Sequence, residues 1–272
     1  MTRVEELLAE IAEWARGEPD VRAALLLGSQ ARTEEPADEW SDVDVVLFVD
    51  DPARRIDDDA WVSRFGTPEL TFVEATPVGG TRERRVLYGD GLEVDFAVVP
   101  PTAAGGLAAD PEVVGAVQRG HRLLHDELGL AEAIAQLADA APPPLRDPAE
   151  VVDDFWYHAL WTARKHRRGE EITARACLES RLKPLLLELA RTHALGDDPR
   201  ADTWHGARFA ERWADPAALR ALWHATARSP HELPEALWRL CDAFDALAAE
   251  TTEPRPGAAA ARARLAELLP LA

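Results

Sequence analysis

Cysteine, lysine and long apolar runs are scarce in this sequence. Cys177 and Cys241 are the only two cysteines among 272 residues, and they lie far apart. Neither a disulfide framework nor a cysteine-based metal site is expected, so we interpret both as small buried hydrophobic side chains. The chain has no uncharged apolar run of about 18 residues, which excludes an apolar membrane-spanning helix. No apolar signal segment precedes the first expected helix, so the cytoplasm is the expected compartment.

Positive charge is scarce in the first half of the chain. Residues 1–140 contain 12 arginines, no lysine and 29 acidic residues, a net charge of −17. Residues 141–272 contain 18 basic and 20 acidic residues, a net charge of −2, and the two halves sum to −19. Because a protein that wraps a nucleic-acid backbone needs a positive surface, nucleic acid is excluded as the main partner. The negative net charge indicates partners that are cations or that carry metal ions instead.

Length and composition indicate two domains. A hydrophobic content of 47% is enough for compact cores, and 272 residues exceed the usual size of one domain. The segment Ala141–Pro144, with its three prolines, reads as a stiff spacer. We therefore expect domains at 1–140 and 145–272. Six of the nine tryptophans predict a separate aromatic core for the second domain, namely Trp156, Trp161, Trp204, Trp213, Trp223 and Trp238.

The periodicity of apolar residues predicts helices and strands in the first domain and helices alone in the second. A capping box at Thr2 and Glu5 starts a helix that ends at Gly17. The expected strands are 23–27, 42–49, 69–76, 84–88 and 92–99, with a hairpin turn at 88–91 and helical material at 111–140. The expected helices of the second domain are 151–168, 173–193, 203–213, 216–227, 230–250 and 257–269, with a kink or split at Pro184.

Two strands carry pairs of acidic residues. Asp42 and Asp44 are two residues apart, so their side chains share one face of a strand, and the same holds for Glu93 and Asp95. If the two strands are neighbours, three or four carboxylates cluster. Such a cluster repels itself unless cations neutralise it, and it suits Mg²⁺ held by carboxylates together with substrate phosphates.

Gly28 and Ser29 end a buried apolar strand at a tight turn. A glycine there lets the backbone approach a phosphate closely, and Ser29 adds a hydroxyl and an N–H donor. Either motif alone is common. Their order is more specific: an apolar strand, Gly28-Ser29, a polar loop, Asp42 and Asp44 before a second strand, then Asp95 on a later strand.

This order resembles the nucleotidyltransferase superfamily, whose motif is Gly-Ser, then Asp-X-Asp, then a third Asp on a later strand. More narrowly, four stretches are similar to the aminoglycoside 6-adenylyltransferases, which modify streptomycin: 28–32, 64–68, 86–91 and 92–96. The resemblance continues through Asp154-Phe155-Trp156 and Ala163-Arg164-Lys165 in the second half. It implies an α/β nucleotidyltransferase domain with a mixed sheet and helices, followed by an all-α helical domain that binds the acceptor, with the active site between them.

The resemblance implies transfer of AMP from MgATP to an aminoglycoside hydroxyl, releasing pyrophosphate. By analogy Asp42 and Asp44 hold metal ions, two Mg²⁺ being expected, while Asp95 accepts the proton of the attacking hydroxyl or completes the second metal site. Gly28 and Ser29 would bind the β- and γ-phosphates. Lys165, with Arg164 or Arg168, is a candidate phosphate contact from the helical domain.

A cleft lined by acidic residues would concentrate a polycationic aminoglycoside. The candidate acceptor contacts are Asp90, Glu93, Asp153, Asp154 and Trp156. Simpler interpretations stand beside them: Lys165 and the Asp153-Asp154 pair could each complement a helix dipole, and Glu93 could be only a neighbour of the site.

Three alternatives to this function stay open. The acceptor could be another small molecule or a protein side chain, although the large helical half favours a small molecule. A degenerate relative that binds nucleotide or drug without catalysis is the third, and the presence of all three carboxylates disfavours it.

Overall fold

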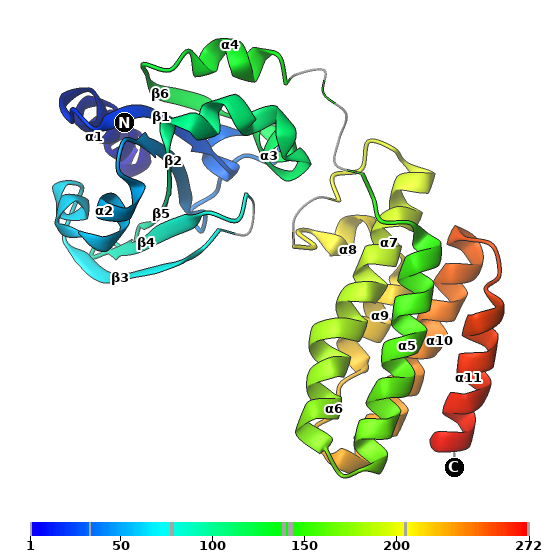
Figure 1. The fold of residues 1–272 in the computed structure, drawn as a ribbon. Coiled ribbons are helices and arrows are strands. Elements are labelled where there is room, and N and C mark those ends of the chain that lie inside the picture. Colours follow the sequence, from blue (N-terminus) through cyan, green and yellow to red (C-terminus); the bar gives the residue numbers. More distant parts are fainter. Residues whose placement is uncertain are drawn as a thin grey trace. The chain divides into compact units, whose positions relative to one another are not determined.

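The computed structural model describes residues 2–32, 34–76, 79–137, 140, 144–203 and 206–270. It divides into two compact units, Met1–Pro144 and Leu145–Ala272. Figure 1 shows strands and helices in the first unit and helices alone in the second. Among the described residues, none of the helices combines the length and the apolar character needed to cross a membrane.

A six-stranded mixed sheet forms the centre of the first unit. Its spatial order is β3-β4-β5-β2-β1-β6, and only the neighbours β2 and β5 are parallel. The strands are β1 (Val21–Leu27), β2 (Val43–Val49), β3 (Pro68–Ala75), β4 (Arg82–Tyr88), β5 (Glu93–Val99) and β6 (Arg122–Asp126). The expectation of a mixed sheet is thereby confirmed.

One expected segment of the first unit, residues 111–140, differs from the structure. Residues 111–140 were expected to be helical throughout, but they contain α3 (Pro111–Arg119), β6 and α4 (Leu130–Ala135). β6 forms because its backbone pairs with β1 at the edge of the sheet, where Leu25 lies opposite Leu123.

Helices cover both faces of this sheet. On one face, α1 (Arg3–Gly17), α2 (Pro52–Asp57) and the short 3₁₀ helix η2 (Ala60–Arg64) pack over the alternate residues Val43, Val45 and Leu47 of β2. On the other face, α3, α4 and the 3₁₀ segment η3 (Pro101–Ala109) cover Phe48 and Val99. Because side chains alternate along a strand, Asp44 and Asp95 share the face of Phe48 and Val99, toward the opposite end of their strands.

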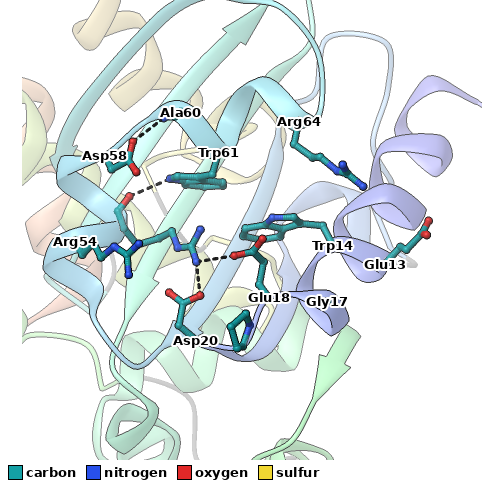
Figure 2. A pocket seen from close by; sticks show the side chains of 12 residues that line it. Glu13, Trp14, Gly17, Glu18, Asp20, Arg54, Asp58, Ala60, Trp61 and Arg64 are labelled. Atoms are coloured by element: carbon teal, nitrogen blue, oxygen red, sulfur yellow. Dashed lines mark hydrogen bonds and ion pairs between the residues drawn. The ribbon is translucent and has the colours of Figure 1, made fainter.

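A stack of aromatic rings joins α1 to η2. Trp14 lies nearly parallel to Trp61 (Figure 2), with ring centroids 5.3 Å apart. The Arg55 guanidinium lies 5.2 Å from the centroid of the Trp14 ring. Arg55 also pairs with Glu18 and Asp20. These contacts fix the helical layer on the side of the sheet away from the carboxylates.

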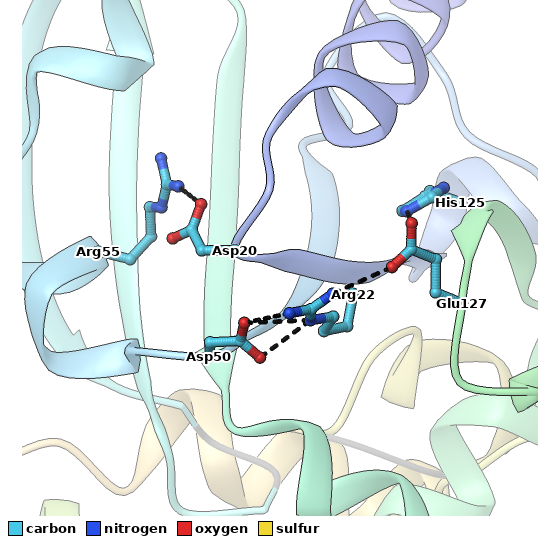
Figure 3. Close-up of polar contacts among 6 residues, drawn as sticks. All are labelled: Asp20, Arg22, Asp50, Arg55, His125 and Glu127. Carbon is cyan, nitrogen blue, oxygen red and sulfur yellow. Dashed lines mark hydrogen bonds and ion pairs between the residues drawn. The ribbon is translucent and has the colours of Figure 1, made fainter.

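An ion-pair network lies at the end of the sheet where β1 begins and β2 ends. Arg22 at the start of β1 donates three hydrogen bonds to Asp50 and one to Glu127, beyond the ends of β2 and β6 (Figure 3). Val21 lies opposite Val49 at this end, whereas Leu27 lies opposite Asp44 at the other. The Arg22 network therefore lies at the opposite end of β1 and β2 from the acidic residues.

The second unit is a helical bundle. Its helices are α5 (Pro148–Arg167), α6 (Glu171–Cys177), α7 (Lys183–Asp197), α8 (Ala210–Trp213), α9 (Pro216–His224), α10 (Leu233–Thr251) and α11 (Pro256–Leu268). A π-helical turn, Leu178–Leu182, lies between α6 and α7, and Pro184 lies in the first turn of α7; the irregularity expected at Pro184 is therefore a π-helical turn just before it, with the backbone helical throughout.

The core of this unit contains some of the expected tryptophans. Phe155 stacks on Phe244 with centroids 3.7 Å apart, and Trp156 and Trp238 are buried beside them. Trp223, in contrast, is 72% exposed, which contradicts its expected place in the core. Trp204 lies outside the described residues.

The expected helix 203–213 is shorter in the structure. Among the described residues of this segment, only the four residues of α8 are helical, because the backbone before them has positive φ at Ala207 and Phe209.

Candidate active site

Three carboxylates meet at one end of the parallel pair β2 and β5. Asp44 lies directly opposite Asp95 in the register of the two strands, and Asp42 comes two residues before Asp44. Asp42, Asp44 and Asp95 each offer a ligand atom, and these atoms all lie within 4.8 Å of one another. The condition set by the sequence, that the two acidic strands be neighbours, is met.

The donor set of this cluster fits Mg²⁺. The three groups are hard oxygen donors, and their mutual repulsion is relieved when cations bind among them. Glu93 lies on the same strand face as Asp95 but is exposed, and it does not belong to the cluster.

Asp95 is the most buried member of the cluster. It is only 8% exposed, and Arg85, directly opposite on β4, places Nη2 3.4 Å from Asp95 Oδ2. The pKa of Asp95 is raised to about 7: burial is the largest cause, Arg85 lowers the pKa, and the negative charges of Glu83, Asp44 and Asp42 raise it. A carboxyl group with this pKa can accept and release a proton near neutral pH.

Gly28 fits closely against the cluster. It follows Leu27, the residue of β1 opposite Asp44, and its φ of +68° is disfavoured for residues with a side chain. A Cβ atom at this position would overlap the Asp44 carboxylate. Gly120 plays a similar part at the end of α3, because a Cβ there would meet the backbone of Ala31 in the turn that follows Gly28.

Ser29 carries an unpaired hydroxyl. The residue is 3% exposed, and its Oγ is buried with no hydrogen-bond partner among the described residues. A buried polar group without a partner costs free energy, which a bound phosphate oxygen could recover. Gly28 and Ser29 therefore fit the expected phosphate cradle.

The remaining predicted residue of the first unit, Asp90, has an arginine partner. Asp90 accepts a hydrogen bond of 2.8 Å from Arg3, which lowers the pKa of Asp90. A surface depression of about 830 Å³ is lined by Trp14, Trp61 and their neighbours, in the helical layer against the opposite face of the sheet (Figure 2). That depression is separate from the carboxylate cluster.

The predicted residues of the helical unit are held by contacts within that unit. Lys165 pairs with Glu170 at 2.6 Å and lies 5.1 Å from the Trp161 ring. Asp153 pairs with Arg255. Trp156 is 2% exposed within the core, so its burial favours a packing role over the expected contact with the acceptor.

Asp154 is also engaged within the helical unit. Arg146 and Arg181 contact its carboxylate at 2.9 and 2.5 Å, and His158 lies at 2.7 Å. Burial opposes ionisation, but the hydrogen bonds from the two arginines outweigh it and lower the pKa of Asp154. These contacts are those of a residue that joins α5 to its neighbours.

Arg85 and Glu83 were not singled out from the sequence. Arg85 pairs with Glu83 at 2.8 Å and with Glu74 at 2.5 Å, beside its contact with Asp95. The signal that could have revealed them is the turn at 88–91, because a tight hairpin fixes the register of the strands that it joins and so places Arg85 opposite Asp95.

The sheet, the Gly-Ser turn and the three carboxylates define a nucleotidyltransferase. The family model described as streptomycin adenylyltransferase matches residues 1–255, and the chain belongs to that family.

Two solved structures are similar over much of the chain. One is an aminoglycoside 6-adenyltransferase from Bacillus subtilis, 14% identical, with all of both chains covered and a TM-score of 0.46. The other is a nucleotidyltransferase-like protein from Exiguobacterium sibiricum, 14% identical, with 86% of this chain and 72% of that one covered and a TM-score of 0.38. No curated protein sequence gives a significant match.

Proposed function

We propose that this protein transfers AMP from MgATP to a hydroxyl group of an aminoglycoside of the streptomycin type and releases pyrophosphate. The observation that carries the proposal is the meeting of Asp42, Asp44 and Asp95 within 4.8 Å of one another, beside the Gly28-Ser29 turn. Membership of the streptomycin adenylyltransferase family supports the choice of donor and acceptor.

The three carboxylates and the Gly28-Ser29 turn would have different roles in this reaction. Asp42 and Asp44 would hold two Mg²⁺ ions, which offset the phosphate charge and stabilise the entering and leaving oxygens. Gly28 and Ser29 would bind the β- and γ-phosphates. The acceptor oxygen attacks the α-phosphorus, the bond to the β-phosphate oxygen breaks, and the hydroxyl proton passes to Asp95 or, where Asp95 completes the metal site, to solvent.

The acceptor is proposed to be a polycation. Residues 1–140 carry a net charge of −17, and an acidic surface raises the local concentration of cations. Glu93 is exposed on the same strand face as Asp95 and is the acidic side chain best placed to meet an acceptor amine or guanidine. Asp90, Asp153 and Asp154 would act only after exchange of their arginine partners, and Lys165 would reach phosphate only after leaving Glu170.

Mass spectrometry of acceptors after incubation with each nucleoside triphosphate and Mg²⁺ tests the proposal. We expect an aminoglycoside to gain one adenylyl group with ATP, and we expect equal release of pyrophosphate. Asp44→Asn should abolish both products, whereas Asp50→Asn, at the opposite end of β2, should leave them intact. Binding of MgATP with no transfer to any acceptor would favour the non-catalytic alternative, and an adenylylated protein product would favour the protein acceptor.

A further inference from the structure

Arg85 is surrounded by carboxylates from three adjacent strands. Glu74 comes from β3, Glu83 from β4 itself and Asp95 from β5, and the Arg85 guanidinium contacts them at 2.5, 2.8 and 3.4 Å. Arg85 lies opposite Asp95, and Glu74 lies opposite Glu83. Since residues opposite one another on neighbouring strands point to the same side, all four side chains share the sheet face of the cluster.

Two of these carboxylates are buried. The side chains of Glu83 and Asp95 are 7% and 11% exposed, and charged groups at such burial need a partner of opposite sign. Among the described residues, Arg85 is the only cationic side chain that pairs with Asp95. Arg85 therefore offsets part of the negative charge around Asp95 in the protein without bound cations.

The guanidinium is itself held in place. Its Nε donates a hydrogen bond of 2.9 Å to Glu83 Oε1, and the same nitrogen lies 2.5 Å from Glu74 Oε1. Its Nη2 lies 2.8 Å from Glu83 Oε1 and 3.4 Å from Asp95 Oδ2, so the planar guanidinium holds its ion pair with Asp95 while it is fixed by the two glutamates. A lysine carries its charge and its three donors on a single nitrogen and could not make this branched arrangement.

We propose that Arg85 is a positioning residue that holds the Asp95 carboxylate toward Asp42 and Asp44 and offsets the charge of the three. This inference rests on the proposed function for the identity of the reaction. Two effects of opposite sign follow. Loss of Arg85 leaves Asp95 poorly oriented, which slows the transfer, while the more negative cluster attracts divalent cations more strongly.

The test compares Arg85→Gln and Arg85→Lys with Arg22→Gln. Arg22 is a matched control because it also pairs with two carboxylates, Asp50 and Glu127, at the other end of the sheet (Figure 3). The two readouts are kcat with saturating MgATP and acceptor, and Mn²⁺ affinity by calorimetry on the nucleotide-free protein.

For Arg85→Gln we expect kcat to fall at least tenfold while Mn²⁺ binds several-fold more tightly. Arg85→Lys keeps the charge, so its Mn²⁺ affinity should match that of the unaltered protein. Its kcat should lie between the values for the unaltered protein and for Arg85→Gln. Arg22→Gln should change neither value. A purely structural role would not tighten Mn²⁺ binding, so unchanged or weaker Mn²⁺ binding in Arg85→Gln overturns the proposal, as does a kcat within threefold of the unaltered protein.

A milder variant, Glu74→Gln, tests the proposal if Arg85→Gln does not fold. Glu74 is 45% exposed, so Glu74→Gln loosens the guanidinium with little cost in burial, and we expect about a threefold loss of kcat. A kcat equal to that of the unaltered protein would count against the proposal. The Mn²⁺ measurement needs no acceptor, so it decides on Arg85 even if no aminoglycoside is a substrate.

Discussion

Gly28 and Asp44 are in contact across β1 and β2, with no room for a side chain between the Gly28 backbone and the Asp44 carboxylate. The glycine also has a φ of +68°, so two separate constraints act on one position. The backbone that would bind phosphate and the carboxylate that would bind metal are therefore placed by a single close approach.

Gly28→Ala should abolish transfer by displacing Asp44. We expect at least a hundredfold loss of kcat/KM, with a loss of about 1–3 kcal/mol of stability from the strained backbone and the overlap. Gly129→Ala is the matched control, because Gly129 has a φ of +74° and open space where a Cβ would lie. The control should lose some stability and keep its activity. Steady-state kinetics and denaturant unfolding of both variants decide, and equal activities would contradict the prediction.

Asp95 should make the cation-free protein less stable as the pH rises. Its pKa is about 7 in the folded protein against 3.8 for an unperturbed aspartate, so the folded state holds one extra proton between these values. The associated stability is complete below about pH 4, falls by about 1.4 kcal/mol per pH unit and is lost above about pH 7, a total of about 4 kcal/mol.

Asp95→Asn removes this titration and provides the comparison. Between pH 5 and pH 8, in the presence of a chelator, we expect the variant to gain about 3 kcal/mol of stability relative to the unaltered protein. Denaturant titrations at several pH values measure the difference. Parallel pH profiles for the two proteins would show that Asp95 ionises normally.

Lys165→Ala should weaken the use of MgATP. We expect KM for MgATP to rise about tenfold if the amine contacts phosphate, since charge-assisted hydrogen bonds are worth about 1.5–3 kcal/mol. The chain has only one other lysine, Lys183, which likewise pairs with a glutamate at 2.6 Å. Lys183→Ala should leave KM unchanged. Identical kinetics of the two variants would assign Lys165 to a helix-terminal ion pair.

The candidate cluster was predictable because its signals are local. The spacing of Asp42 and Asp44 fixes a shared strand face, and only the pairing of their strand with that of Asp95 was left to the structure. β6 was not predictable in this way. Arg122–Asp126 has five residues, none of them β-branched, and it becomes a strand only through pairing with β1.

The distant partners of the acidic residues could not be read from the sequence either. Asp90 and Arg3 are 87 positions apart, and Asp153 and Arg255 are 102 apart. Such ion pairs depend on tertiary packing, which spacing along the chain does not encode. They are the reason that several acidic residues expected to face an acceptor have arginine partners instead.

Ser29→Ala should separate stability from nucleotide binding. The Ser29 hydroxyl is buried without a hydrogen-bond partner among the described residues, so its removal should leave the free protein equally stable or more stable by about 1 kcal/mol. If the hydroxyl serves a phosphate, KM for MgATP should rise about five- to tenfold. Ser180→Ala is the control, because that hydroxyl donates to the Ala176 carbonyl within the helical unit and should not affect KM. Thermal unfolding without nucleotide and kinetics with varied MgATP measure the two effects. A destabilised Ser29→Ala with unchanged KM would mean that the hydroxyl serves the fold of the turn, and the phosphate cradle would then consist of backbone groups alone.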